Sequence, residues 1–569
     1  MNKYILKLSA IFAILVLSTS CDDFLDEPVL GNSTDETFYD TQYKLQSALN
    51  ATYDILQSDA YTDQDWRFGE ALGDNVIVHD VGLSSHMGQL VNFRFDTNNN
   101  YIKNRWSILY KGIHRANQVI ANAHRVQIAD YGVSTYNSIR YILGQAKFLR
   151  AFFYFNLVKT YGGVPIRPEV ETVDNLVIPR STLEECYAYI EKDLREAAVM
   201  LPTRFPITEN GKAGSGAAIA LLMKVLMYQA TNGAPSEKWE QMKELGDYFV
   251  KGGSMTYNKM LRFDELYGED GYNMDWETLR QSLWFKPQAD LNESEKYEEL
   301  NGEMPVLVKS YGFNYVDYTG AAISYLDQFY VAGEFCEGSI FEIVFKESGD
   351  GTSGDTNEGD YIFQELFPAS ATASHMHCVD EIVQTIFGND PRSQQMRGHQ
   401  SSIDFDNDYC FVGAGRQQTL KWYTPRKERP VYGGDNAKNR RVIRYVEVVL
   451  MYAEALNECG YGVEAIEQLN SYKTVANGTA TSALYTAGGY GYVRDQIWDE
   501  RQIELCFEFD RFFDIVRQGR ADELLQKFAE KKLNGSRGQY FRKGINEIFP
   551  IPQNEIDISN GIVTQNPGY

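Results

Sequence analysis

The chain has 569 residues, of which 78 are acidic and 54 are basic, and its net charge is −24 at pH 7. Such a charge repels phosphate backbones and the basic clusters are short, so nucleic acid is excluded as a partner. Hydrophobic residues make up 43% of the chain, enough for a packed core, and the length usually requires more than one core or a large helical array.

The N-terminus has the layout of a bacterial lipoprotein signal. Lys3 and Lys7 precede an apolar run, LSAIFAILVL, and three small residues then lead to Cys21. The run is about half of the roughly 20 residues that span a bilayer, so we expect a cleaved signal over residues 1–20. We expect lipidation of Cys21 and a tether over residues 21–37. The alternative is an ordinary secreted protein with a chance cysteine near its cleavage site.

Residues 38–254 are predicted to form an N-terminal helical region. Pro165 follows Gly162-Gly163 and marks the end of one helix, while Ser181 with Glu184 has the pattern of a capping box at the start of the next. Apolar residues at helical spacing predict helices over residues 38–58, 102–126, 136–161, 182–201, 217–231 and 238–250.

Residues 255–569 are predicted to form a C-terminal region that begins with a loop-rich segment, 255–434. This segment is rich in Gly, Asp, Asn and Tyr and has β-like runs at 339–345 (SIFEIVF) and 418–423 (QTLKWY). Binding residues are commonly carried by such loops on a rigid frame. We therefore expect the ligand-binding residues to lie mainly in this segment.

No metal site and no cofactor are predicted. Three places collect ligand types, namely His375 to Cys378, Asp404 to Asp408 and Gly349 to Asp360. The first lacks an identifiable fourth ligand, and the second departs from the calcium-loop pattern. In the third, an acidic loop is the favoured interpretation and a structural calcium ion is the alternative.

Helices return over residues 435–569. Tyr445–Cys459 and Val463–Tyr472, separated by Gly460 and Gly462, look like one tetratricopeptide-type unit. A further helix is predicted over 498–517, where Glu508 with Arg511 and Asp514 with Arg517 are spaced to meet on the helix and, lying among aromatic residues, are expected to form structural ion pairs.

Enzyme motifs are missing from the sequence. It has no GxSxG, HExxH or phosphate-loop pattern. Glu500, Glu504 and Glu508 would stack on one helix face, unlike two carboxylates placed across a glycosidic bond. No CxxC pair occurs, and the cysteines in helical patterns are expected to be free and buried: Cys186, Cys459 and Cys506.

Several stretches together resemble the SusD/RagB family of outer-membrane lipoproteins. The resemblance runs from the signal to the last residue. It is carried by residues 21–26 (CDDFLD), 147–165 (KFLRAFFYFNLVKTYGGVP), 389–392 (NDPR), 444–458 (RYVEVVLMYAEALNE), 498–520 (WDERQIELCFEFDRFFDIVRQGR), 549–552 (FPIP) and 565–569 (QNPGY).

The resemblance implies a mainly α fold, with tetratricopeptide-like helix pairs packed against an irregular, loop-rich half with a few short strands. It implies a non-enzymatic, lipid-anchored protein on the cell surface that captures an oligosaccharide and delivers it to a SusC-like TonB-dependent transporter. Two alternatives stay open: a peptide-binding component of a protein-nutrient system, and a surface glycan hydrolase. The sequence does not identify the sugar.

Aromatic side chains are the first candidates for glycan contacts. Trp276, Trp284 and Trp422 lie in the loop-rich segment, and Trp66 is a further candidate. In starch-binding relatives, aromatic residues in a loop after the first helix pair help to form the sugar platform. The comparable stretch here, residues 79–92, has no aromatic residue and offers polar contacts instead, including Asp80 and His86. We therefore expect a glycan other than helical starch, or a ligand bound mainly through hydrogen bonds.

Overall fold

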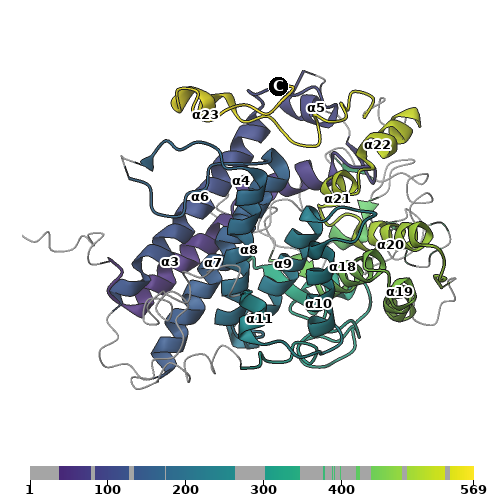
Figure 1. Ribbon diagram of the computed structural model, residues 1–569, viewed down its shortest axis with the longest axis horizontal. Helices are drawn as coiled ribbons and strands as arrows, with labels where there is room; N and C mark the ends of the chain where they lie inside the picture. The colour runs from purple at the N-terminus through teal and green to yellow at the C-terminus, as the bar shows by residue number, and fades with distance from the viewer. Residues whose placement is uncertain are drawn as a thin grey trace, which may run out of the picture.

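The computed structural model is mainly helical in its described part (Figure 1). It describes residues 38–78, 82, 84–126, 133–172, 175–262, 302–346, 376–377, 388, 390, 392, 397–398, 418–422, 428, 437–476, 484–531 and 538–569. The α-helices are α3 (Gln42–Gln57), α4 (Asp59–Asp65), α5 (His86–Val91), α6 (Asn100–Asn122), α7 (Val133–Tyr161), α8 (Leu183–Met200), α9 (Ser215–Gln229), α10 (Glu237–Phe249), α11 (Tyr257–Leu261), α18 (Tyr445–Glu458), α19 (Gly462–Ala476), α20 (Tyr490–Leu505), α21 (Arg511–Arg517), α22 (Ala521–Glu530) and α23 (Gln553–Ile558).

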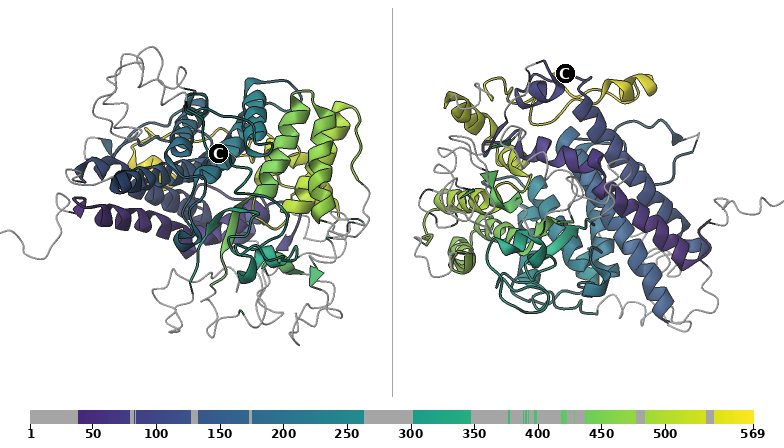
Figure 2. Two further views of the ribbon diagram at one scale, coloured as in Figure 1. Left: turned by 90° about the horizontal axis from the view of Figure 1, so that it is seen from below. Right: turned by 180° about the vertical axis from the view of Figure 1, so that it is seen from behind.

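Helices that follow one another in the chain pack against one another. Contacts join α6 to α7, α7 to α8, α8 to α9 and α9 to α10, and α18 then packs on α10, α19 and α20. Figure 2 shows the early helices, purple to blue, on one side of the molecule and α18 to α20, in green, on the other. The predicted α-rich architecture is therefore confirmed, while the domain boundaries drawn from the sequence stay predictions.

Local sequence signals fix the helix ends to within a few residues. Helix α7 ends at Tyr161, and Gly162 then adopts φ +74°, a left-handed conformation that glycine accepts at little cost. The capping box of α8 is formed by Thr182 and Glu185, one residue later than predicted. The Thr182 hydroxyl accepts a hydrogen bond from the Glu185 backbone, and the Glu185 carboxylate accepts one from the Thr182 backbone.

The helix predicted over residues 498–517 is wrong, because α20 and α21 are separated by a corner. Phe507 and Phe509 adopt φ 64° and 69°, conformations that end a right-handed helix. The corner packs on the single π-turn at Trp66–Glu70, where a Cβ built on Gly69 would lie 1.6 Å from the Phe509 carbonyl oxygen. Only glycine permits this approach.

The corner also changes the predicted ion pairs. Glu508 pairs with Arg444 and Lys421, and Arg511 pairs with Asp74 at 2.6 Å, so the predicted Glu508–Arg511 pair is wrong. The predicted pair of Asp514 and Arg517 is confirmed at 2.7 Å.

The described strands form three antiparallel pairs. The longest pair joins β2 (Ser339–Ile343) to β6 (Arg440–Arg444), and it confirms the β-like run at 339–345. The run at 418–423 forms only the two-residue strand β5 (Gln418–Thr419), followed by a 3₁₀ turn. The others are β1 (Ile77–Val78), β3 (Met376–His377) and β4 (Arg397–Gly398), with β1 paired to β3 and β4 to β5.

A buried ion network joins the loop-rich segment to α20. The Arg392 side chain is fully buried and donates hydrogen bonds to Asp390, Glu500 and Glu504 at 2.6 to 3.0 Å. Burial opposes ionisation of Glu504, but Arg444, Arg392 and Lys421 outweigh it and lower its pKa to about 2. The network fixes Asp390 and Arg392 against α20.

Three expectations from the sequence concern membrane-spanning helices, metal-binding sites and free cysteines. Within the described ranges, no helix is both long and apolar enough to cross a bilayer. The described residues also contain no group of three or more His, Cys, Asp or Glu side chains arranged to hold a metal ion. Cys186 and Cys506 are free and buried, as predicted, and Cys459 is free and half-buried.

Candidate functional site

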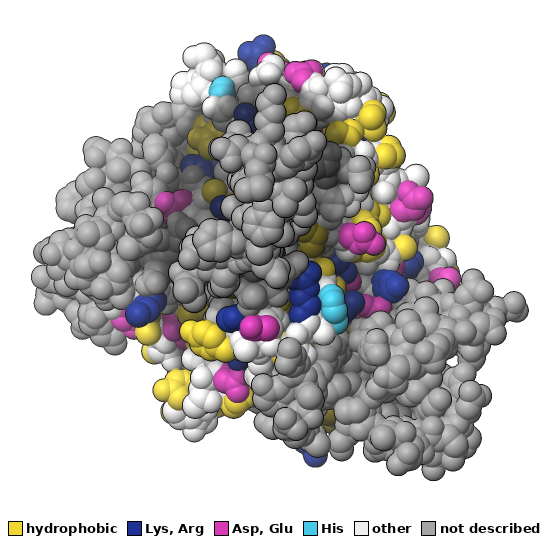
Figure 3. All heavy atoms as spheres, turned by 90° about the vertical axis from the view of Figure 1, so that its left-hand side faces the viewer, with side chains coloured by type: hydrophobic (Ala, Val, Ile, Leu, Met, Phe, Trp, Pro, Cys, Tyr) yellow, Lys and Arg dark blue, Asp and Glu magenta, His cyan; other side chains and the backbone are white. Residues whose placement is uncertain are grey.

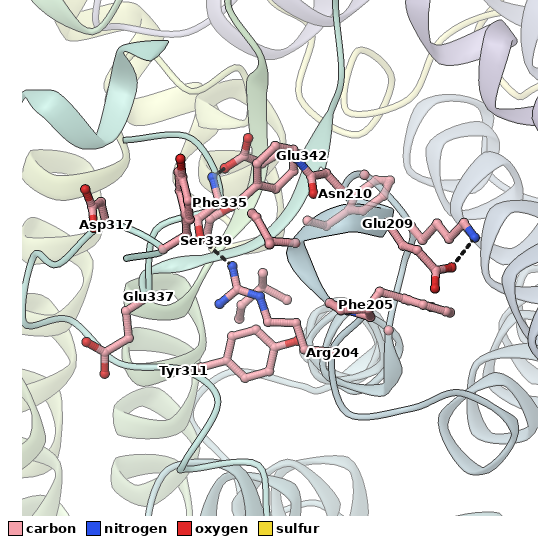
Figure 4. Close-up of a pocket in the computed structure, with 18 of the residues that line it drawn as sticks. Arg204, Phe205, Glu209, Asn210, Tyr311, Asp317, Phe335, Glu337, Ser339 and Glu342 are labelled. Atoms are coloured by element: carbon pink, nitrogen blue, oxygen red, sulfur yellow. Dashed lines mark hydrogen bonds and ion pairs between the residues drawn. The ribbon is translucent and has the colours of Figure 1, made fainter. Parts of the chain in front are cut away.

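An open cleft of about 380 Å³ lies where the helical frame meets the loop-rich segment (Figure 4). Its walls come from the α8–α9 connection at residues 204–214, from residues 311–320, and from residues 335–342, which lead into β2. Known ligand pockets have volumes of roughly 300–1,000 Å³, so the cleft is large enough to hold a small molecule or part of a chain.

Arg204 holds the three walls together. Its guanidinium donates to the backbone carbonyls of Ser310, Phe335 and Cys336 at 3.3, 2.6 and 3.1 Å. In Figure 4 the side chain reaches across the cleft above the Tyr311 ring. Because these carbonyls use its donors, Arg204 acts as a structural brace rather than as a site for an anionic ligand.

Tyr318 stands at the tip of a rigid turn at the cleft wall. Asp317 Oδ1 accepts hydrogen bonds from the backbone of Thr319 and Ala321 and from the Thr319 hydroxyl, at 2.7 to 2.9 Å. Gly320 follows at φ +86°, which closes the turn. Tyr318 remains 62% exposed, so its ring is presented to solvent by a backbone that is already ordered.

Two residues that flank the cleft have strained backbones. Tyr315 and Phe335 adopt φ 51° and 54°, which aromatic residues rarely do. Each such residue costs about 1–3 kcal/mol, and strain of this kind clusters at functional sites. Tyr315 is held by its ring contact with Tyr325, and the Phe335 backbone N–H by the Glu342 carboxylate at 2.8 Å.

The charged residues of the cleft walls are mainly acidic. The two cations are Arg204 and Lys212, and Lys212 is paired with Glu209. The four acids are Glu209, Asp317, Glu337 and Glu342. With the half-buried Phe205 and the exposed Tyr318, the cleft offers hydrogen-bond acceptors and aromatic faces, which suits a ligand rich in hydroxyl groups.

A second cavity of about 240 Å³ adjoins the cleft on the other side of the Asn210–Lys212 turn. The turn touches the residue that follows β2, since a Cβ on Gly211 would lie 2.4 Å from a methyl group of Val344. The floor of this cavity is the polar face of α3, with the amides of Gln46, Asn50 and Gln57. The two cavities share the turn and Glu342, so they form one interrupted groove.

Trp66 and Trp422, two predicted ligand contacts, are buried and need correction. Trp66 is 1% exposed in the π-turn, with Arg67 over its ring. Trp422 is 7% exposed, stacks on Phe509 at 4.3 Å and donates from Nε1 to the Phe507 carbonyl. Neither ring face is open to a sugar, so both are structural.

Of the remaining predicted site residues, the structure describes only His86, which does not line the cleft. His86 is half-buried at the start of α5, where its Nδ1 accepts a hydrogen bond from the Asn100 backbone at 3.0 Å and so caps α6. Asp80, Trp276, Trp284 and the lipidation site Cys21 lie outside the described residues, as do the Asp404–Asp408 and Gly349–Asp360 stretches.

The carboxylates that an enzyme interpretation would use are engaged elsewhere. Glu500 and Glu504 are fully buried around Arg392, and Glu508 is bound by Arg444 and Lys421. None of the three lines the cleft.

On the face shown in Figure 3, acidic, basic and hydrophobic side chains of the described residues are interspersed.

Sequence reasoning missed Tyr318, although a signal was present. Asp317-Tyr-Thr-Gly320 is a turn sequence, with Asp at its first position and Gly at its fourth. An aromatic residue inside such a turn is held out into solvent.

The helices, the short strand pairs and the open cleft define a mainly α scaffold with a polar and aromatic groove. Two protein-family models match the amino-acid sequence of this chain. One, described as "Starch-binding associating with outer membrane", covers residues 23–227, and one described as the SusD family covers residues 417–569. The chain therefore belongs to the SusD/RagB family.

Similar proteins cover the whole chain. SusD-like protein P2 from Formosa agariphila is 26% identical over 581 residues, which is 100% of each chain. A laminarin binding SusD-like protein of known structure has a TM-score of 0.66 at 22% identity, covering 93% of this chain and 100% of that one. Surface glycan-binding protein A from Bacteroides thetaiotaomicron, solved with laminarihexaose, has a TM-score of 0.64 at 20% identity, covering 92% and 99%. The two structures share the fold with this chain.

Proposed function

We propose that the protein captures a neutral oligosaccharide in the cleft beside Tyr318 and delivers it to a SusC-like TonB-dependent transporter without cleaving it. The exposed Tyr318, which lines the open cleft from an ordered turn, carries the proposal. Sugar rings stack on aromatic faces, and hydroxyl groups donate to carboxylates such as Asp317 and Glu337. Structural relatives that bind laminarin and laminarihexaose support a glycan as the ligand class.

The charge of the cleft favours a neutral ligand over a sulfated or uronic one. Four acidic and two basic residues line the cleft, but Glu342 is buried and lies 3.5 Å from Arg441, so the walls carry an excess of one negative charge. One unit charge about 8 Å from an anionic sugar would oppose binding by about 0.5 kcal/mol in water, or roughly twofold, at low salt. The same charge suits a peptide only if the peptide is basic.

Tyr318→Ala tests the site. Stacking of a ring on an aromatic side chain contributes about 0.5–1.5 kcal/mol beyond the area it buries, so the variant should bind a neutral oligosaccharide about tenfold more weakly. Titration calorimetry of purified protein against neutral glucan, mannan and galactan oligosaccharides measures the loss. Tyr43→Ala is the matched control, because Tyr43 is 81% exposed on α3 and lines neither cavity. Equal affinities of both variants for a glycan that the wild type binds would place the site elsewhere.

The anchor and the partner have their own tests. We propose that Cys21 carries the lipid and that the protein faces outward from the outer membrane; the family description supports association with that membrane. Protease treatment of intact cells should remove the protein, and affinity purification from detergent-solubilised membranes should recover a TonB-dependent barrel. Binding of basic peptides but of no glycan would favour the protein-nutrient alternative, and release of new reducing ends from a bound glycan would establish a hydrolase.

A further inference from the structure

A small, partly open cavity of about 60 Å³ lies away from the cleft. It is lined by residues of α4, α7, α9, strand β6, Trp422 and the corner between α20 and α21. Its charged wall residues are Asp65, Lys159, Lys224, Arg440, Arg441, Glu508 and Asp510. Four of these are cations and three are anions, so the cavity has an excess of one positive charge inside a chain whose net charge is −24.

The acidic residues of the wall are already shared between cations. Asp510 contacts Lys159 at 3.0 Å and Lys224 at 2.7 Å, and Lys224 also contacts Glu447 at 2.8 Å. Burial alone would raise the pKa of Asp510, but the two ammonium groups outweigh it and hold the pKa well below its usual range. Asp510 therefore has no charge left over for a further cation.

Glu508 and Arg441 are balanced by partners outside the cavity. The Glu508 carboxylate accepts hydrogen bonds from Arg444 at 2.5 and 2.7 Å and also from Lys421. Arg441 donates to the carbonyls of Asn439 and Tyr330 and lies 3.5 Å from Glu342.

Arg440 is the cation that lacks an equivalent partner. It is 4% exposed, and its closest acid is Asp65, at 3.4 Å from Nη1. Asp65 is also held by Arg105 at 3.3 Å. Nε and Nη2 of Arg440 are buried and have no hydrogen-bond partner in the described part of the chain. The guanidinium carbon lies 5.4 Å from the Phe509 ring and 5.9 Å from the Trp422 ring, and neither ring accepts a strong hydrogen bond.

Buried donors on a charged group are costly when they have no acceptor. A water molecule needs about 10–15 Å³ of accessible cavity volume, so 60 Å³ is enough for a halide ion with a few waters. We propose that the cavity binds one small monovalent anion of the halide type, which accepts hydrogen bonds from Nε and Nη2 of Arg440 and neutralises the excess positive charge.

The site would strengthen the contact between the two halves of the fold. Lys159 and Lys224 come from α7 and α9, whereas Arg440 begins β6 and Asp510 precedes α21. Burial lowers the pKa of Lys159; Asp510 opposes this shift, and Lys224 and Arg105 add to it. The proposal does not depend on the glycan cleft.

Crystals grown or soaked with sodium bromide test the site directly. The expected result is an anomalous bromide peak within hydrogen-bond distance of Arg440 Nε or Nη2. If the cavity holds only water and shows no anomalous peak, the proposal is wrong. This test uses the wild-type protein and does not depend on whether any variant folds.

Thermal unfolding tests binding in solution. The wild type is compared in sodium chloride and in sodium gluconate at equal ionic strength, since gluconate is too large for the cavity. Chloride at about 100-fold its dissociation constant should raise the melting temperature of the wild type by about 2 °C. The rise should vanish in Arg440→Gln and persist in Arg115→Gln, which alters a partly exposed surface arginine. A bromide peak without this chloride effect would mean binding at crystal concentration only, and the proposal would fail.

Discussion

Arg392→Met should destabilise the protein strongly, because Arg392 is the centre of a network from which water is excluded. Its side chain and those of Glu500 and Glu504 are all 0% exposed, and Asp390 is 4% exposed. Removing one partner of a buried ion pair costs about 3–5 kcal/mol, since the charges left behind are no longer compensated. For about 550 residues the unfolding entropy is about 1.1 kcal/mol/K, so we expect the melting temperature to fall by about 3–5 °C at pH 7.

The pH dependence of this loss distinguishes charge from packing. The pKa of Glu504 is about 2 in the fold, so its stabilising contribution is complete above its unfolded pKa and is lost as the pH falls toward 2. Once Arg392 is removed, protonation of the abandoned carboxylates relieves the uncompensated charge. The difference in melting temperature between the wild type and the variant should therefore shrink between pH 7 and pH 4.

Differential scanning calorimetry at both pH values measures the effect. Lys527→Met is the matched control, because Lys527 and Glu523 form a pair that is 64% and 62% exposed, and it should change the melting temperature by less than about 1 °C. A loss below 1 °C for Arg392→Met at pH 7, or a deficit that grows toward pH 4, would refute the role given to the network.

Two further substitutions test the pH response and the tight corner. Burial raises the pKa of Glu334 to about 7 against the opposing effect of Arg441, so the fold favours the protonated form and stability declines as the pH rises from about 4.5 to about 7. After allowance for partial exposure, the free energy of unfolding declines by about 1–2 kcal/mol over this range, and Glu334→Gln should abolish the decline. If the melting temperature of the variant falls between pH 5 and pH 8 by as much as that of the wild type, this prediction is wrong. Gly69→Ala should cost about 3 kcal/mol or more, because the new methyl group meets a backbone carbonyl, whereas Gly491→Ala on the open face of α20 should be neutral or stabilising. Equal urea midpoints for these two glycine variants would show that the corner adapts.

Helices with a local signal could be predicted from the sequence. Helix α7 has a broad apolar face and a glycine stop, and α8 has a capping box, so each could be placed within a few residues. The strand at Ser339–Ile343 was also visible as a short β-branched and aromatic run. In these cases the local preferences agree with the final fold.

The corner at Phe507–Phe509 could not be predicted, because tertiary contacts override the local pattern there. FEFDRFF reads as a continuous amphipathic helix, yet the Phe509 carbonyl packs against Gly69, more than 400 residues earlier in the chain. The Glu70 carboxylate also accepts a hydrogen bond from the Phe509 backbone at 3.2 Å. No local feature of the sequence reports these distant partners.

The candidate site was harder to predict than the fold. Its walls come from residues 204–214 and 311–342, and their proximity depends on how the helical frame meets the loop-rich segment. Composition pointed to aromatic residues in loops, but it could not separate a buried tryptophan such as Trp422 from an exposed tyrosine such as Tyr318. Exposure is a property of the tertiary structure and cannot be read from residue type.

The most direct test of the central claim is titration calorimetry of the purified wild-type protein and Tyr318→Ala against a panel of neutral, uronic and sulfated oligosaccharides. We predict that the wild type binds at least one neutral oligosaccharide, that it binds the anionic ones more weakly, and that Tyr318→Ala loses about tenfold in affinity. Tight binding of an anionic glycan that is indifferent to Tyr318, or no glycan binding at all, would contradict the proposed site and function.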